Sequence, residues 1–205
     1  MKKTFDFFAV LFLFCFIFAS AFAQNDIDDV YGQLKAKYKS IKAVSLNFKR
    51  SSDKIAGSLK AKTGNKYYLE FKDRTIVCNG TTIWNYSRKD KSVVINNYEE
   101  STSQVKIEEI FFTFLNKYKP SDLKTEQSSQ GLSAYVLLMK PEEASESNKD
   151  IKLHIDKEKF NIVSLEINND GNWEVWEIDK LNTKKHSDKS FDFTPPDNTN
   201  IIDLR

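Results

Sequence analysis

The chain has 205 residues and a formal net charge of +2, and its acidic and basic residues are interspersed. A nucleic-acid-binding protein would show a strongly basic stripe, so this balance argues against that class. The length is sufficient for one domain with a substantial buried core.

Residues 1–23 have the three zones of a cleavable signal peptide. Lys2 and Lys3 form a basic start, an apolar run follows, and the small residue Ala23 precedes the predicted cleavage site. The apolar run is shorter than the roughly 20 residues that a membrane-spanning helix needs. We therefore expect these residues to be removed and residues 24–205 to form a single domain that works outside the cytoplasm.

The segment from Ile27 to Ile41 is predicted to form an amphipathic helix. Its apolar residues recur mostly three or four positions apart, which is the spacing of one helix face. Asp26 can cap the start of this helix, and Asp28 and Asp29 lie near the positive end of its dipole. Because the apolar stripe is narrow, we expect the helix to cover another element.

Alternation of apolar and polar residues then predicts about five antiparallel strands. Each has one apolar face, because successive side chains of a strand point to opposite sides of the sheet. The turn pairs Gly64-Asn65 and Asn79-Gly80 separate some of them. The predicted strands are Val44–Phe48, Ile55–Ala61, Tyr67–Phe71, Thr82–Tyr86 and Ser92–Tyr98.

Helical spacing returns between Val105 and Tyr118, which predicts a second helix that ends near Pro120. About four strands follow, and the polar loop Pro141–Asp150 is expected at the tip of a hairpin. Two helices beside so many strands are expected to cover one face of a strongly curved sheet. The later strands are predicted at Leu132–Met139, Ile151–Ile155, Ile162–Ile167 and Trp173–Leu181.

Side chains capable of catalysis or metal binding form no recognisable motif in the sequence. His154 and His186 are far apart and have no further ligand at metal-site spacing. Cys78 lies in an apolar stretch, so we expect a buried, unreactive thiol rather than a catalytic partner of His154. We therefore expect no enzyme activity, no cofactor and no metal site.

The informative pattern in the sequence is apolar. One face of the predicted sheet and the second predicted helix together offer a large apolar surface. An ordinary filled core accounts for this pattern; the alternative is a partly open groove for acyl chains, in which each buried methylene contributes about 0.8 kcal/mol. The candidate acyl-chain residues are Val44, Leu46, Phe48, Leu59, Tyr67, Leu69, Phe71, Ile76, Trp84, Tyr86, Ile107, Ile110, Phe111 and Phe114.

Several short motifs occur in a characteristic order. The runs Gly57–Lys62 and Tyr67–Phe71 are followed by the segment Asn79–Tyr86, which reads Asn-Gly-Thr-Thr-Ile-Trp-Asn-Tyr. The segment Phe191–Pro196 then reads Phe-Asp-Phe-Thr-Pro-Pro. This order resembles the periplasmic outer-membrane lipoprotein carrier (LolA-like) family, which has an Asp-Gly-x-x-Leu-Trp-x-Tyr hairpin and a Phe-x-Phe-x-Pro-Pro ending.

The resemblance implies both a fold and a function. The implied fold is a half-open, incomplete β-barrel, in which a strongly curved antiparallel sheet is covered by α-helices that form a lid over an apolar cavity. The implied function is that of a monomeric periplasmic chaperone for acylated lipoproteins. Its implied partners are an inner-membrane ABC-type release complex and, where one exists, an outer-membrane acceptor. The alternative is a regulatory domain of the same fold that senses lipids or lipoproteins in the envelope.

The chain departs from the family pattern after the glycine-containing strand. Some relatives have Arg-Pro there, and the arginine helps to hold the lid closed, whereas this chain has Thr63-Gly64. Asn79 also replaces the usual acidic residue of the hairpin. We therefore expect a lid that is closed mainly by apolar contacts from Phe111 and Phe114.

Overall fold

The computed structural model describes residues 26–53, 55–99, 112, 114–127, 131, 133–143 and 149–205. Within these residues the fold consists of one twelve-stranded sheet and one α-helix, residues 26–39, which we call the N-terminal helix. The predicted signal peptide lies outside the described residues. The strands are β1 (Ala43–Arg50), β2 (Ala56–Lys62), β3 (Lys66–Phe71), β4 (Arg74–Asn79), β5 (Thr82–Ser87), β6 (Ser92–Asn97), β7 (Tyr118–Gln127), β8 (Ser133–Pro141), β9 (Ile151–Asp156), β10 (Ile162–Asn169), β11 (Asn172–Asn182) and β12 (Asn200–Asp203).

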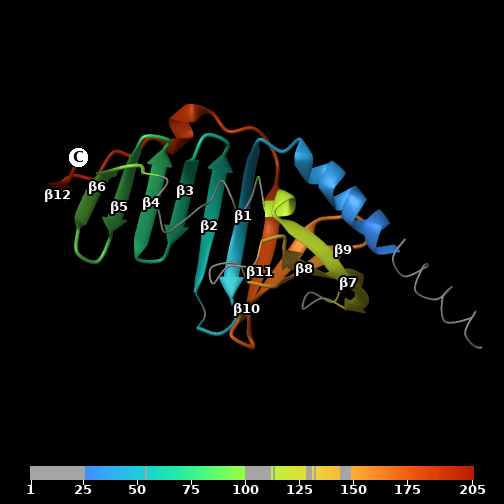
Figure 1. The fold of residues 1–205 in the computed structure, drawn as a ribbon. Helices are drawn as coiled ribbons and strands as arrows, with labels where there is room; N and C mark the ends of the chain where they lie inside the picture. The colour runs from blue at the N-terminus through green and yellow to red at the C-terminus, as the bar shows by residue number, and fades with distance from the viewer. Residues whose placement is uncertain are drawn as a thin grey trace, which may run out of the picture.

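The sheet consists of two antiparallel meanders joined at its centre. Its spatial order is β12-β6-β5-β4-β3-β2-β1-β11-β10-β9-β8-β7, so β1 pairs with β11 between the two meanders. The last strand, β12, pairs parallel with β6 and is the single exception to the predicted antiparallel pattern among the described strands. Figure 1 shows that the sheet is curved and that its edge strands, β12 and β7, do not meet. The structure therefore confirms a mostly β, curved and unclosed sheet.

The turn residues explain where the hairpins form. Gly64 and Asn65 have positive φ angles, 87° and 58°, and they lie in the three-residue loop between the paired residues Lys62 and Lys66. The Asn79 side-chain carbonyl accepts hydrogen bonds from the backbone N–H groups of Thr81 and Thr82, at 3.1 and 2.9 Å. Both of the turns predicted at these pairs are thus confirmed.

The prediction of several covering helices is corrected by the structure. Phe114–Asn116 forms only a short 3-10 helix, η2, and Tyr118 begins strand β7 instead of ending a helix. Because β7 is an edge strand, Pro120 is tolerated in it without a backbone N–H to donate. The rest of the second predicted helix, residues 105–111 and 113, lies outside the described residues. Within the described part of the chain, one α-helix covers the sheet.

The strand register divides the sheet into two faces. Residues paired across antiparallel strands share a face, so Leu46, Leu59 and Leu69 lie together. The N-terminal helix packs Val30 and Leu34 into the same buried apolar cluster. We call this covered side the inner face and the opposite side the outer face.

The segment between β11 and β12 covers part of the outer face. Its short 3-10 helix η3 (Asp188–Phe191) contacts β3 and β4, and the side chain of Phe191 is fully buried. The outer-face residues Thr75 and Val77 of β4 are also buried. Figure 1 shows this orange-to-red segment passing along the sheet to reach β12 beside β6. None of the described helices is long and apolar enough to cross a membrane.

Candidate functional site

Eight of the candidate acyl-chain residues lie on the inner face. They occupy β1 to β4 and form one continuous apolar cluster with the N-terminal helix. Five of them are between 2% and 8% exposed, so the middle of this face is filled in the present conformation. The buried five are Val44, Leu46, Leu59, Tyr67 and Leu69, and the half-buried three are Phe48, Phe71 and Ile76.

Two other candidates lie on the outer face instead. Ile76 pairs with Asn85, so Trp84 and Tyr86, which flank Asn85, point to the opposite side of the sheet. The ring of Tyr86 is 5.7 Å from that of Phe193, centroid to centroid. The two motifs that carry the family resemblance therefore contact each other on the outer face, where they attach the C-terminal segment.

One of the remaining candidates, Phe114, lies in the described part of the chain. Phe114, in η2, is half-buried against the inner-face cluster, and its ring centroid is 6.4 Å from that of Tyr118. Ile107, Ile110 and Phe111 lie outside the described residues. The predicted apolar lid contacts are therefore represented here by Phe114 alone.

An aromatic group lies at the Arg50 end of β1 on the inner face. The ring centroid of Phe48 is 5.6 Å from that of Phe71 and 5.8 Å from that of Trp176. The Arg50 guanidinium stacks over Trp176, 5.1 Å from the ring centroid. A Cβ added at Gly57 would lie 2.6 Å from a ring carbon of Phe48, so this glycine makes room for the ring. Trp176 is absent from the sequence-based set, although its strand was predicted.

Within the described residues, hydrogen bonds of Tyr31, Lys37 and Tyr38 attach the N-terminal helix to the rest of the fold. The Tyr31 hydroxyl donates to the carbonyl oxygen of Leu115 at 2.7 Å and lies 3.0 Å from that of Tyr118. Burial, and then the negative charge of Glu142, raise the pKa of Tyr31. These bonds connect the helix to η2 and to the start of β7.

The second and third attachments reach β10 and the turn before it. The backbone N–H of Ile162 donates to the Tyr38 hydroxyl at 3.1 Å. The Lys37 ammonium donates to the Asn161 side chain at 2.6 Å. Thr63 stands where some relatives have the lid arginine. Its backbone N–H donates to the carbonyl oxygen of Lys42, in the connection between the helix and β1, at 3.0 Å. Hydrogen bonds from other residues therefore supplement the apolar contacts of the helix.

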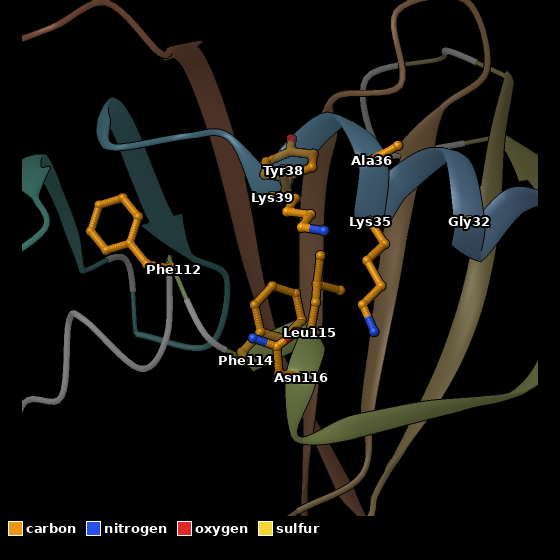
Figure 2. A pocket seen from close by; sticks show the side chains of 9 residues that line it. All are labelled: Gly32, Lys35, Ala36, Tyr38, Lys39, Phe112, Phe114, Leu115 and Asn116. Carbon is orange, nitrogen blue, oxygen red and sulfur yellow. The ribbon is translucent and has the colours of Figure 1, made fainter.

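A cavity of about 470 Å³ lies between the N-terminal helix and the segment around η2. We call it the helix pocket. Figure 2 shows Lys35 and Lys39 extending from the helix toward this segment, with the rings of Phe112 and Phe114 across the opening. Among the described residues, Phe114 is the predicted candidate that lines it. The helix residues were not among the candidates, although the exposed residues Lys35 and Lys39 lie four positions apart on one helix face. The lining residues are Gly32, Lys35, Ala36, Tyr38, Lys39, Phe112, Phe114, Leu115 and Asn116.

The side chains that were weighed as a catalytic pair are held apart. Cys78 is fully buried on the inner face of β4, where burial raises the pKa of its thiol. His154 lies on the outer face of β9, with its Nε2 atom 2.8 Å from a carboxylate oxygen of Glu166. Five strands of the sheet separate β4 from β9. This geometry does not bring Cys78 and His154 into contact.

The fold and the site define a class of protein with an open, curved sheet whose apolar inner face is covered by a helix. Residues 40–194 match the family model described as "Outer membrane lipoprotein carrier protein LolA". The chain therefore belongs to the LolA family, as its motifs predicted.

Comparisons with individual proteins give more distant similarities. An uncharacterized protein of Methanocaldococcus jannaschii is 23% identical over 90% of this chain, and the chain spans 56% of that relative's length. An uncharacterized conserved protein from Thermus thermophilus has a similar fold, with a TM-score of 0.55 and 10% identity over 86% of this chain and 98% of its own. A Vibrio parahaemolyticus domain whose name refers to outer membrane lipoprotein sorting gives a TM-score of 0.43 and 14% identity over 80% of this chain and 94% of its own.

Proposed function

We propose that this protein is a non-enzymatic periplasmic carrier that binds the acyl chains of lipoproteins and transfers them from the inner to the outer membrane. The partners in this proposal are an inner-membrane ABC-type release complex and, where present, an outer-membrane acceptor. Membership of the LolA family supports the proposal. The observation that carries it is the continuous apolar cluster shared by the N-terminal helix and the inner face.

Binding by this route requires the N-terminal helix to move. Ile27, Val30 and Leu34 of the helix are buried against the inner face, so an acyl chain has to displace them. Exposing three aliphatic side chains costs about 5–9 kcal/mol, at about 1.5–3 kcal/mol each. The helix pocket marks the seam along which the helix and η2 separate in this proposal.

The free energy available for opening depends on the environment of the acyl chain before it binds. A chain in a bilayer is already shielded from water, so moving it into an apolar cavity gains little from the hydrophobic effect. The opening free energy therefore has to come from the release complex. Release is expected to depend on nucleotide hydrolysis by that complex and not on the carrier alone.

A release assay tests this proposal. Inner-membrane vesicles that contain newly made lipoproteins and the matching release complex are incubated with ATP and the purified protein. Lipoproteins should appear in the supernatant as a soluble complex with this chain, and their intact mass should be unchanged. Vesicles without ATP serve as the control. If every lipoprotein stays in the vesicles while the complex hydrolyses ATP, the carrier proposal is wrong.

The edge strand β12 favours a second candidate, a regulatory domain that binds a partner. Ile201, Ile202 and Leu204 are 57%, 41% and 63% exposed, and they are the large apolar side chains that the described chain leaves most open to solvent. An edge strand with exposed apolar side chains can accept a strand from another protein. Binding of an envelope protein that survives removal of all lipid would favour this candidate over the carrier.

A further inference from the structure

We propose that the helix pocket selects an amphiphile with an anionic headgroup, namely an anionic phospholipid, whose acyl chain enters between the N-terminal helix and η2. Its phosphate would lie between the ammonium groups of Lys35 and Lys39. The inference deepens the proposed function and rests on it for the entry of an acyl chain at this seam. It adds a class of ligand and the residues that select it.

The two lysines form a cationic rim on one side of the pocket. They lie four residues apart on the helix, so their Cβ atoms are neighbours at about 5–6 Å. Within the part of the chain that the structure describes, neither ammonium group forms an ion pair. The Lys35 ammonium lies over the ring of Tyr31, 5.5 Å from its centroid. In Figure 2 both side chains reach toward Leu115 and Asn116.

The wall opposite the helix is apolar. Phe112 and Phe114 are half-buried and also pack against the inner-face cluster, so the pocket is continuous with the apolar interior. Its volume of about 470 Å³ falls in the range that ligand pockets usually have. An apolar wall beside two lysine ammonium groups is complementary to a molecule with a hydrocarbon tail and a negatively charged head.

One described acidic side chain near the N-terminal helix has an ion-pair partner of its own. Glu142 influences Tyr31, but its carboxylate is 3.7 Å from the Lys119 ammonium. The Asn116 side chain, which also lines the pocket, carries no charge and can donate hydrogen bonds to a phosphate. The rim is therefore cationic, and two ammonium groups with an amide can bind a phosphate.

Titration with two lysophospholipids tests the inference. The purified protein is titrated calorimetrically with 14-carbon lysophosphatidylglycerol and with 14-carbon lysophosphatidylcholine, both below their micelle concentrations. The chains are identical, and only the first lipid has a net negative charge. At low salt the anionic lipid should bind about fivefold more tightly, the size expected for two exposed ion pairs. The preference should shrink at about 0.15 M salt, where the screening length is about 8 Å.

The double variant Lys35→Gln/Lys39→Gln should bind both lipids equally, and its affinity should fall more for lysophosphatidylglycerol than for lysophosphatidylcholine, whose phosphate is offset by its own cationic choline group. The variant Lys72→Gln/Lys89→Gln removes the same charge at exposed turn positions and should keep the preference. If wild type binds both lipids equally, or if the first variant keeps the preference, the inference is wrong while the carrier proposal stands. If neither lipid binds, acyl-chain entry at this seam is wrong, and the inference fails with it.

Discussion

Gly57 shows how a single missing side chain shapes the inner face. A Cβ at this position would lie 2.4 Å from the backbone oxygen of Glu70 and 2.6 Å from a ring carbon of Phe48. The first of these contacts is with backbone, so it cannot be relieved by rotating a side chain. The glycine lets β2 and β3 approach closely while the Phe48 ring contacts Phe71.

The variant Gly57→Ala should lower the free energy of unfolding by about 1–3 kcal/mol, because the added methyl group overpacks this contact. The measurement is urea denaturation followed by tryptophan fluorescence, which also reports on Trp176. Gly32→Ala is the control: nothing lies within 4 Å of its added Cβ, and it sits in a helix. That control should raise stability by about 0.5–1 kcal/mol. An equal effect of both variants would contradict the proposed role of Gly57.

Residue patterning predicted the inner face well where the strands alternate. Leu46, Leu59 and Leu69 were assigned to one face, and the register confirms this. Trp84 and Tyr86 were also among the candidate acyl-chain residues. The face on which they lie depends on the pairing of β5 with β4. Strand β4 was not predicted, because Thr75, Val77 and Cys78 are all buried and apolar and polar residues do not alternate along it.

Among the elements, the N-terminal helix is attached partly by hydrogen bonds of its side chains. Tyr31 is its connection to η2 and β7, the elements beside the helix pocket. Because an opening movement separates the helix from η2, the Tyr31 hydroxyl is expected to favour the closed arrangement. This element-level role could not be derived from sequence, since the acceptors, Leu115 and Tyr118, are backbone carbonyls 84 and 87 residues away.

The variant Tyr31→Phe should lower the free energy of unfolding by about 1 kcal/mol, the usual net contribution of one hydrogen bond. It should also raise amide hydrogen exchange in residues 26–39 more than in β1 to β6. Tyr135→Phe is a matched control, because the Tyr135 hydroxyl forms no hydrogen bond within the described residues. Uniform exchange across the helix and the sheet in Tyr31→Phe would show that the hydroxyl does not specifically hold the helix.

The second predicted helix shows a different limit of sequence patterning. Helical spacing between Val105 and Tyr118 continued past the point where the chain becomes β7. Most residues of β7 are exposed, so this edge strand lacks the apolar alternation that identifies an inner strand. Its pairing with β8 follows from tertiary contact and not from a local preference.

At the scale of the whole molecule, the C-terminal segment joins the two meanders across the outer face. It leaves β11 at the centre of the sheet, places Phe191 and Phe193 against β3 to β5, and ends in β12 beside β6. Asp188 adds ion pairs to Lys62 and Lys66, which hold the pKa of its carboxyl below the usual range. Asp188 is exposed and both lysines are partly exposed, so solvent weakens these ion pairs and the apolar contacts supply most of the attachment.

The variant Phe191→Ala should therefore destabilise the whole fold, by about 3–5 kcal/mol, as expected for removal of a fully buried phenylalanine. Phe193→Ala is the control, because its ring is half-exposed and contacts Tyr86 from one side, so its effect should be clearly smaller. Urea denaturation gives both values. Hydrogen exchange should show that Phe191→Ala also releases the amides of β12, whose pairing with β6 requires the preceding segment to stay in place. The Phe191→Ala protein could instead be strongly destabilised while the β12 amides stay fully protected from hydrogen exchange. That result would mean that the parallel pairing with β6, and not Phe191, holds the C-terminal segment on the sheet.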